Sequence, residues 1–417
     1  MKPCSAVRPA SDSKTSTPAL SPRSSAALSS LLLAVSLVAL GCGSDRDDAK
    51  EDRQSLATQA EKIVVAVAWP WEARSELLFS QGIDMALEEV NAAGGIDGRE
   101  LSVLRVDDHE SVNEGRLAAQ RLSDNPEVMA VIGHLQSHVT VPAAAIYDAG
   151  GLLLVSPAAT NADLTEQGYS RVFRACFVDH DVGTQMGDYA KAQGYKRVAI
   201  YYVRSIYGQA LASAFESRIA EIGGVNVVAR DAHGAEQDVA GGSLLPLFSR
   251  WTQLSVDAIF LAGEVPSAGR IIAEIRQAGL EMPVFGGDAM SSPALIQVGG
   301  EAVEGTVVAT FFHPSEPRPE VAAFVEAFAA RFDTPPDVAA ALGYDALHLL
   351  AEAMRQAPTP APEDVAQALR ALDAWSGVTG PFTFDAEGDL VGRAVPKVVV
   401  ESGEFIYLPE AAASADG

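Results

Sequence analysis

The sequence predicts an α/β protein with two lobes, each built on a doubly wound parallel sheet and joined to the other by a hinge. Short β-branched runs alternate with amphipathic stretches of helical length along most of the chain, which is the pattern of βαβ units. The chain has 417 residues, 48% of them hydrophobic, so it can bury two ordinary cores. The alternation occurs twice in succession, which favours two lobes of similar architecture.

The first series of elements predicts lobe 1. Its strands are near-continuous apolar runs, as expected for a parallel sheet that helices cover on both faces. We expect strands at 63–69, 101–108, 128–133 and 152–158, separated by helices over 82–93, 114–124 and 139–149.

A second series predicts lobe 2. After the apolar run 171–177, we expect strands at 197–203, 225–231, 256–263 and 283–287. Helices are expected over 182–193, 209–222 and 268–278, and a further helix is expected to end near Leu254. Three further helical stretches follow residues 305–312. The chain then ends in the segments 382–390 and 395–408, which are expected to form strands around a tight turn.

These assignments divide the chain between the two lobes. Lobe 1 is expected to comprise 62–178 and 309–390, and lobe 2 to comprise 179–308 and 391–410, with a disordered tail at 411–417. We expect the chain to cross between the lobes near 177–179, near Val308 and near the C-terminal hairpin. Asp179 and Asp181 are assigned either to this hinge or to a helix cap.

The N-terminus carries an export signal. An apolar run over 26–40 follows Arg23 and is too short for a comfortable transmembrane helix, but its length suits a signal-peptide core. Residues 39–42 (Ala-Leu-Gly-Cys) resemble the bacterial lipoprotein signal, which implies removal of 1–41 and acylation of Cys42. The alternative is an ordinary cleaved signal with an incidental cysteine. Residues 42–61 are polar and charged, and predict a flexible tether.

Charge excludes several classes of partner. Removing 1–41 takes away four basic residues and one acid, so the formal net charge changes from −25 to −28. Nucleic-acid binding needs a dense Lys/Arg surface, which this chain lacks, and the same holds for basic membrane-surface patches. The membrane is therefore expected to be contacted only through the lipid, with the acidic body in the periplasm or another extracytoplasmic space.

The cysteines predict no structural disulfide. Cys4 leaves with the signal and Cys42 carries the lipid, so Cys176 has no internal partner. Cys176 lies within an apolar run, where an inert core thiol is the expected state.

Enzymatic and metal-binding motifs are absent from the sequence. No G-x-G-x-x-G follows the first strand, and neither a phosphate-binding loop nor a G-x-S-x-G elbow occurs. His134 and His138 are four residues apart, but His134 falls in a loop and no third ligand is evident. The acidic run 107–110 is interpreted as a solvated loop, because it lacks the ligand spacing of a calcium site. We therefore expect neither an enzyme nor a bound metal or cofactor.

Two strand ends carry polar groups that suit an anionic ligand. Ser137 follows the strand 128–133 where a helix begins, and is expected to act both as N-cap and as hydroxyl donor. Thr160 and the carbonyl of Ala158 follow the next strand. Because ligands of open parallel sheets bind where strand C-termini meet helix N-termini, these groups indicate one binding site.

Five segments together resemble the branched-chain amino-acid binding family of periplasmic proteins. They are residues 86–101, 131–140, 156–169, 207–208 and 380–390, within a resemblance that runs from about 63 to 392. The resemblance implies a type I periplasmic binding protein clamshell that delivers an amino acid or similar ligand to the permease of an ABC transporter. A ligand-sensing receptor of the same fold is the rival interpretation, and an enzyme on a similar fold is a remote third.

The resemblance also implies roles for site residues. Ser137 and Thr160 match residues that hold the ligand α-carboxylate, and the backbone at Ala158 matches one that helps hold the ammonium group. Tyr207 matches a residue of the facing lobe that closes over the ligand. Asp288, after the strand 283–287, stands where the family places the carboxylate partner of the ammonium, usually a glutamate.

Departures from the family pattern bear on the ligand side chain. Glu264 stands where an aromatic residue is common, which suits a more polar or cationic ligand. The loop after the first strand is short and lacks the usual capping aromatic, a role that Trp69 or Trp71 is placed to take. Glu110 and Gln136 replace the two cysteines of the family's disulfide. Amino-acid-like specificity is expected, but not leucine-like specificity.

Overall fold

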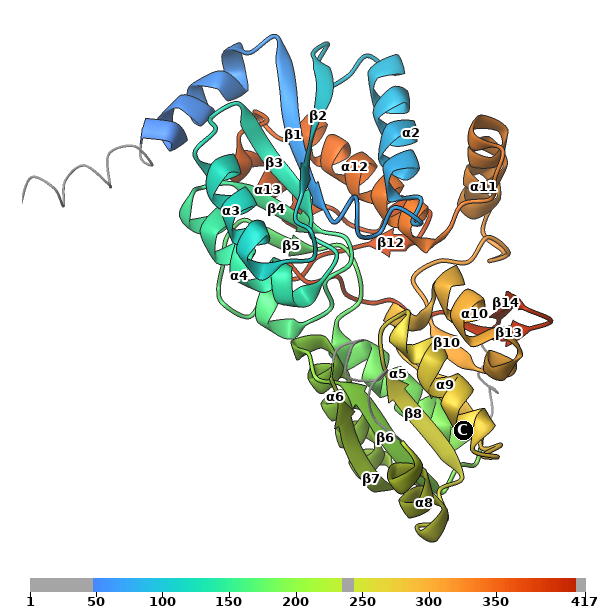
Figure 1. The fold of residues 1–417 in the computed structure, drawn as a ribbon. Helices are drawn as coiled ribbons and strands as arrows, with labels where there is room; N and C mark the ends of the chain where they lie inside the picture. Colours follow the sequence, from blue (N-terminus) through green and yellow to red (C-terminus); the bar gives the residue numbers. More distant parts are fainter. Residues whose placement is uncertain (1–47, 235–243, 410–417) are drawn as a thin grey trace, which may run out of the picture. The chain divides into compact units, whose positions relative to one another are not determined.

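The computed structural model describes residues 48–234 and 244–409. The signal peptide, Cys42 and the predicted C-terminal tail lie outside these ranges. The described chain forms two α/β lobes, each with its own sheet (Figure 1). No helix in the described ranges has the length and apolar character needed to span a bilayer.

Lobe 1 contains a five-stranded parallel sheet in the order β2-β1-β3-β4-β5. Its strands are β1 (Lys62–Trp69), β2 (Glu100–Asp107), β3 (Val128–Gly133), β4 (Leu153–Ser156) and β5 (Val172–Arg174). The connecting helices are α2 (Phe79–Ala92), α3 (Val112–Ser123) and α4 (Ser137–Ala149), followed by the 3-10 turn η1 (Ala162–Leu164). All residues of β3 and β4 are buried, as the apolar runs predict.

Lobe 2 contains a seven-stranded sheet in the order β14-β13-β10-β9-β8-β6-β7. The strands are β6 (Arg197–Val203), β7 (Asn226–His233), β8 (Ala258–Ala262), β9 (Val284–Gly286), β10 (Val307–Ala309), β13 (Lys397–Glu401) and β14 (Glu404–Leu408). The helices are α5 (Asp179–Ala192), α6 (Ile206–Ile222), α8 (Leu245–Gln253), α9 (Ser267–Gln277) and α10 (Pro293–Gly299), with 3-10 turns η2 (Asp288–Met290) and η3 (Gly300–Val303). β13 alone among these strands runs in the opposite direction, antiparallel to β10 on one side and to β14, its hairpin partner, at the sheet edge.

In both sheets the strand order changes direction beside the first strand of the lobe. β1 lies between β2 and β3, and β6 lies between β7 and β8. The loops that follow β1 and β3, and those that follow β6 and β8, therefore diverge to opposite faces and leave a crevice at the carboxyl edge of each sheet. In each lobe, the crevice is the place where residues that contact a ligand are expected.

Three segments connect the two sheets, at 175–178, 310–318 and 383–396. The second leads into α11 (Pro319–Phe332), α12 (Val338–Gln356) and α13 (Pro362–Ala371), of which α12 packs on α2 of lobe 1. The short ladder of β11 (Trp375–Gly377) and β12 (Gly380–Phe382) follows before the chain returns to β13.

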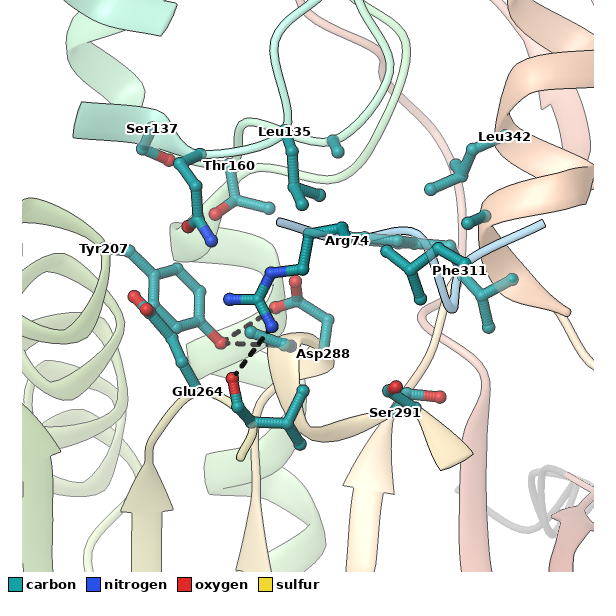
Figure 2. Close-up of a pocket in the computed structure, with 18 of the residues that line it drawn as sticks. Arg74, Leu135, Ser137, Thr160, Tyr207, Glu264, Asp288, Ser291, Phe311 and Leu342 are labelled. Carbon is teal, nitrogen blue, oxygen red and sulfur yellow. Dashed lines mark hydrogen bonds between the residues drawn. The ribbon is translucent and has the colours of Figure 1, made fainter. Parts of the chain in front are cut away.

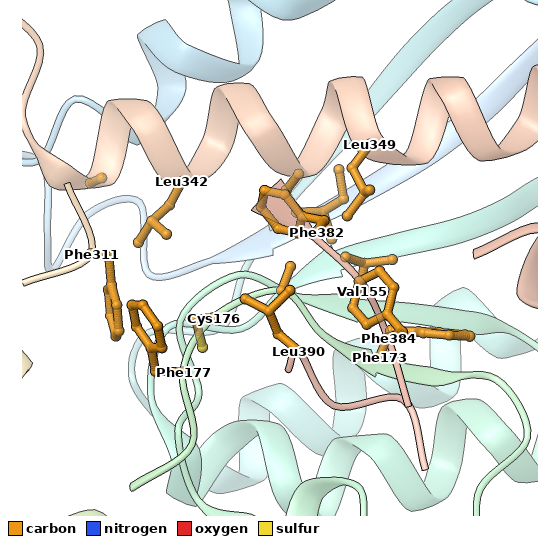
Figure 3. Close-up of a cluster of buried hydrophobic side chains, with 14 of the residues drawn as sticks. Val155, Phe173, Cys176, Phe177, Phe311, Leu342, Leu349, Phe382, Phe384 and Leu390 are labelled. Atoms are coloured by element: carbon orange, nitrogen blue, oxygen red, sulfur yellow. The ribbon is translucent and has the colours of Figure 1, made fainter. Parts of the chain in front are cut away.

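Aromatic side chains from two of these connections pack together (Figure 3). The rings of Phe177 and Phe311 stack with centroids 5.7 Å apart, and Leu342 of α12 lies in the same buried cluster. Cys176 is a buried free thiol, and burial raises its pKa, which agrees with the expected inert core thiol.

The structure corrects the prediction of a flexible tether over 42–61. Residues 48–59 are helical, and Arg53 is 1% exposed. Its guanidinium donates hydrogen bonds of 2.7–3.2 Å to four backbone carbonyls, those of Ser123, Asn125, Val128 and Gly150. These carbonyls lie at the C-terminal ends of α3 and α4 and at the start of β3, and the last carbonyls of a helix have no partner within it and favour a cation. One buried cation thus holds this polar segment in place, together with the apolar contacts of Leu56 and Ala57 with the core.

We predict that Arg53→Ala lowers the free energy of unfolding by about 2 to 4 kcal/mol, because it leaves buried carbonyls without donors. Arg53→Lys should recover only part of this loss, since an ammonium group cannot span four acceptors. Chemical denaturation monitored by circular dichroism measures both, with Arg116→Ala on the exposed side of α3 as the control. Equal stabilities for wild type and Arg53→Ala would contradict this account of the N-terminal helix.

Candidate ligand-binding site

One cavity brings together loops from the carboxyl edges of both sheets (Figure 2). All six binding residues predicted from the sequence line it: Ser137, Ala158, Thr160, Tyr207, Glu264 and Asp288. The first three come from lobe 1 and the last three from lobe 2. The predicted residues therefore share one cavity, although Ser137 and Asp288 are 151 residues apart in the sequence (288 − 137).

The lobe 1 side of the cavity presents hydroxyl groups and a helix N-terminus. Ser137 is the first residue of α4, and Gln136 occupies the N-cap position without a side-chain cap bond, so the predicted capping role of Ser137 is wrong. The Ser137 hydroxyl instead accepts a hydrogen bond of 3.4 Å from the backbone N–H of Asn161. Its proton remains available for a ligand oxygen, and the first N–H groups of a helix are commonly free to bind an anion.

Thr160 and Ala158 complete the lobe 1 side. Thr160 is 1% exposed and lies in the loop between β4 and η1, and its carbonyl accepts a 2.8 Å hydrogen bond from the N–H of Asp179. This bond ties the loop to the first connection between the lobes. Ala158 is half-buried in the same loop, beside the cavity.

Tyr207 and Asp288 form a hydrogen-bonded pair on the lobe 2 side. The Tyr207 hydroxyl lies in the cavity from the first turn of α6 and donates to Oδ1 of Asp288 at 3.3 Å. The same hydroxyl accepts a 3.3 Å bond from the N–H of Ala289. A Cβ at Gly287 would lie 2.5 Å from this hydroxyl, so the glycine before Asp288 is what allows the close approach.

Glu264 lies at the end of the loop after β8, beside the first turn of α6. Ser205 caps α6 by accepting a bond from the N–H of Gly208, and its hydroxyl donates to Oε1 of Glu264 at 3.2 Å. One serine thus fixes both the start of the helix that carries Tyr207 and the position of the Glu264 carboxylate.

Burial dominates the electrostatics of these acids. Burial raises the pKa of Asp288 to about 7. The negative charge of nearby Glu264 contributes to this rise, whereas hydrogen bonds from the backbone and from Tyr207 oppose it. Burial also raises the pKa of Glu264, opposed by Ser205 and the more distant His138 and Arg74. The lobe 2 side of the cavity is therefore electronegative and short of compensating positive charge.

Asp179 adds a third buried acid to this region. It is 2% exposed at the first turn of α5, forms no cap bond, and neither carboxylate oxygen has a well-formed hydrogen bond within the described residues. Burial and the neighbouring Asp288 raise its pKa well above the usual range, with the Thr160 hydroxyl and Arg174 opposing in part. Of the two sequence interpretations, simple helix capping is wrong, and the residue does lie at the first connection between the lobes.

Sequence reasoning did not identify Arg74 as a cavity residue. Its Nε pairs with Oε1 of Glu110, to which Gln136 Nε2 also donates at 3.3 Å, and its Nη1 donates to the carbonyl of Val265 in lobe 2 at 3.3 Å. Glu110 and Gln136 therefore take part in a polar network that links three loops of lobe 1 and reaches lobe 2. The one sequence signal for this role is that Arg74 is the single basic residue in the loop 70–77, which follows the first strand.

Comparison with known proteins decides the family. Residues 59–404 match the periplasmic binding protein family over most of the chain. The chain belongs to this family. The Leu/Ile/Val-binding protein homolog 1 of Brucella suis biovar 1 is 32% identical over 312 residues, which are 74% of this chain and 81% of that protein.

Solved structures of periplasmic binding proteins have the same type I fold. The substrate-binding protein of an ABC transporter from Desulfitobacterium hafniense, in complex with Leu, is 37% identical and covers 83% of this chain and 100% of its own, with a TM-score of 0.75. A leucine-binding protein from Thermotoga maritima is 29% identical with a TM-score of 0.75, covering 83% of this chain and 98% of its own. The two-lobed α/β fold predicted from the sequence is thus confirmed.

Other residues singled out in the sequence have structural places in this periplasmic binding protein. Trp69 lines the cavity and stacks on Phe79 with ring centroids 3.7 Å apart, whereas Trp71 is not in the lining and donates its indole N–H to the carbonyl of Val106. Of the two candidates for the missing aromatic, Trp69 is the one at the cavity.

His134 and His138 bond to different partners. His134 is fully buried, with Nδ1 2.6 Å from Oδ2 of Asp108 and Nε2 3.1 Å from the Tyr147 hydroxyl. Asp108 is itself 1% exposed, so the prediction of a solvated loop is wrong for this residue: it is the buried partner of His134. His138 points instead to the carbonyl of Glu110 at 3.3 Å.

Proposed function

We propose that this periplasmic binding protein captures an amino acid or a close analogue between its lobes and delivers it to the permease of an ABC transporter. One observation carries the proposal: a single cavity has hydroxyl groups and a helix N-terminus on one wall and buried carboxylates on the other. A zwitterion with adjacent carboxylate and ammonium groups is the small molecule that matches both walls.

The ligand carboxylate is assigned to lobe 1. The hydroxyls of Ser137 and Thr160 and the first N–H groups of α4 are donors that suit an anion, and the positive end of the helix dipole adds to them. Among the described lobe 1 residues that line the cavity, the carboxylate is that of Glu76, and it lies 3.9 Å from the guanidinium of Arg74.

The ligand ammonium is assigned to Asp288, with the carbonyl of Ala158 as a further acceptor and Tyr207 covering it. Hydrogen bonds between charged groups are roughly twice as strong as neutral ones, and they strengthen when closure excludes water. Because the two ligand charges bind different lobes, binding favours the closed arrangement, and the three connections provide the hinge.

The relatives support an amino-acid ligand and a transport role. The Brucella protein is named for Leu, Ile and Val, and the Desulfitobacterium structure contains Leu and is described as a transporter component. These names favour transport over the rival role of a sensing receptor.

The N-terminal signal supports an extracytoplasmic, lipid-anchored protein. Cys42 is the proposed attachment site, and residues 1–41 the removed signal. The helix that begins by residue 48 and is held by Arg53 would leave only a short segment between the lipid and the folded body.

A panel of ligands tests the proposed function. We expect the protein to be stabilised by at least one α-amino acid in a thermal-unfolding assay, by about 2.7 kcal/mol at a concentration of 100 times Kd. Sugars and nucleotides should have no effect, because they lack the paired charges. Stabilisation by a sugar or nucleotide and by no amino acid would contradict the proposal.

Variants then test the assignment of the two walls. Asp288→Ala should weaken binding of the stabilising amino acid by about 2 to 5 kcal/mol, because it leaves a buried ammonium without its partner. Ser137→Ala should cost less, about 1.5 to 3 kcal/mol, since the helix N–H groups remain. Calorimetric titration measures both, with Asp163→Asn, an exposed acid outside the cavity, as the control. Equal affinities for wild type and Asp288→Ala would remove Asp288 from the site.

Cell fractionation tests the anchor. Cys42→Ala should release the protein from membranes into the soluble extracytoplasmic fraction, because a buried acyl chain contributes about 0.8 kcal/mol per CH₂ and the proposal has no other anchor. Membrane-bound Cys42→Ala, or a soluble mature wild type, would contradict lipid attachment at this residue.

A further inference from the structure

One part of the cavity is polar where the rest is apolar. Arg74, Gln136 and Glu264 line it, and Figure 2 shows Arg74 and Glu264 on the same side as Tyr207 and Asp288. The remaining lining contains the apolar side chains of Leu77, Leu135, Phe311, Val338 and Leu342. An aliphatic ligand side chain would require only the second set, so the polar set calls for a separate explanation.

The positive charge of Arg74 is already compensated. Its guanidinium pairs with Glu110 and donates to the carbonyl of Val265, and Glu76 lies 3.9 Å from Nη1. A ligand anion would therefore compete with two carboxylates for this one cation. Arg74 is better placed to hold the loops of the two lobes together than to bind an acidic side chain.

Glu264 is not compensated in the same way. Within the described residues its one hydrogen-bond donor is the neutral hydroxyl of Ser205, and it forms no ion pair. Burial raises its pKa, which marks the ionised form as short of stabilising partners. A partly buried carboxylate in this state is stabilised by a ligand that brings a cation or a strong hydrogen-bond donor.

The residues that line the cavity have an excess of negative charge. The cavity is lined by three acids, Glu76, Glu264 and Asp288, and by one base, Arg74. An amino-acid ligand brings one ammonium, which the proposed function assigns to Asp288, and its carboxylate binds the other lobe. Glu264 then remains without a partner, and a second cation on the ligand would supply one.

We infer that Glu264 forms a side-chain subsite for a cation, so that the preferred ligand is an α-amino acid with a basic side chain. This inference rests on the proposed function and specifies its ligand class. Neutral amides rank second, because they donate hydrogen bonds without charge. Acidic side chains rank last, because Glu264 and Asp288 repel them.

Matched ligand pairs test the inference in the wild-type protein. Ornithine and norleucine have side chains of the same length and differ in an ammonium against a methyl group, and glutamine and glutamate differ in an amide against a carboxylate. We expect calorimetric titration to give ornithine an affinity about tenfold to a hundredfold above that of norleucine, the range for a hydrogen bond to a charged group. Glutamate should bind more weakly than glutamine.

The variant Glu264→Gln tests the residue itself. It keeps the shape of the side chain and should reduce the preference for ornithine over norleucine by about tenfold or more, while norleucine affinity changes little. Glu301→Gln, an exposed acid of lobe 2 outside the cavity, is the matched control and should keep the wild-type preference. Thermal unfolding of each ligand-free variant establishes that it is folded.

The outcomes separate this inference from the proposed function. Norleucine or glutamate binding as tightly as ornithine, or an unchanged preference in Glu264→Gln, overturns the cation subsite and leaves amino-acid binding intact. Failure of every amino acid to bind the wild type overturns the proposed function and this inference with it.

Discussion

Buried carboxyl groups without a cationic partner, at the interface of the two lobes, are the constraint on which the rest of this structure depends. Asp179 and Asp288 are held in or beside the cleft and form no ion pair within the described residues. A buried carboxylate without a partner is costly, and a protein tolerates it where a ligand completes the arrangement. The acids on lobe 2 and the donors on lobe 1 line one cavity, and we propose that they are two halves of one site, which the ligand joins.

The fold positions these groups by repeating one topology. Each sheet changes strand order beside its first strand, so the loops after β1, β3 and β4 face those after β6, β8 and β9. Short capping interactions then fix the side chains locally, as Ser205 does for α6 and Glu264. The connections between the sheets carry stacked aromatics, Phe177 and Phe311. Polar contacts add to them, such as the bond from the N–H of Asp179 to the carbonyl of Thr160.

The sequence predicted the elements and the six cavity residues because both depend on local pattern or on motif resemblance. Apolar runs locate β3 and β4, and the position after a strand end locates Ser137, Thr160 and Asp288. Helix starts were less exact: α6 begins at Ile206 rather than 209, since Ser205 is the cap.

The remaining features depend on contacts between distant segments, which no local pattern reveals. Arg53 reaches carbonyls 70 to 97 residues away, and Arg74 reaches Val265 across 191 residues. His134 and Asp108 are 26 residues apart in the sequence and form a buried pair. From the sequence, the first had been assigned to a loop and the second to a solvated acidic run. A charged residue in a polar segment predicts exposure by default, and only the tertiary structure shows the exceptions.

Proton release on ligand binding tests the central constraint most directly. Burial places the pKa of Asp288 at about 7 in the ligand-free protein, so at pH 6 the carboxyl is mostly protonated and a bound ammonium must displace the proton. Calorimetric titration with the best-binding amino acid, in buffers of different ionisation enthalpy, measures this. We expect release of about one proton at pH 6 and little at pH 8, with affinity falling as the pH drops below about 7. Binding heats that do not depend on the buffer at pH 6 would contradict the account.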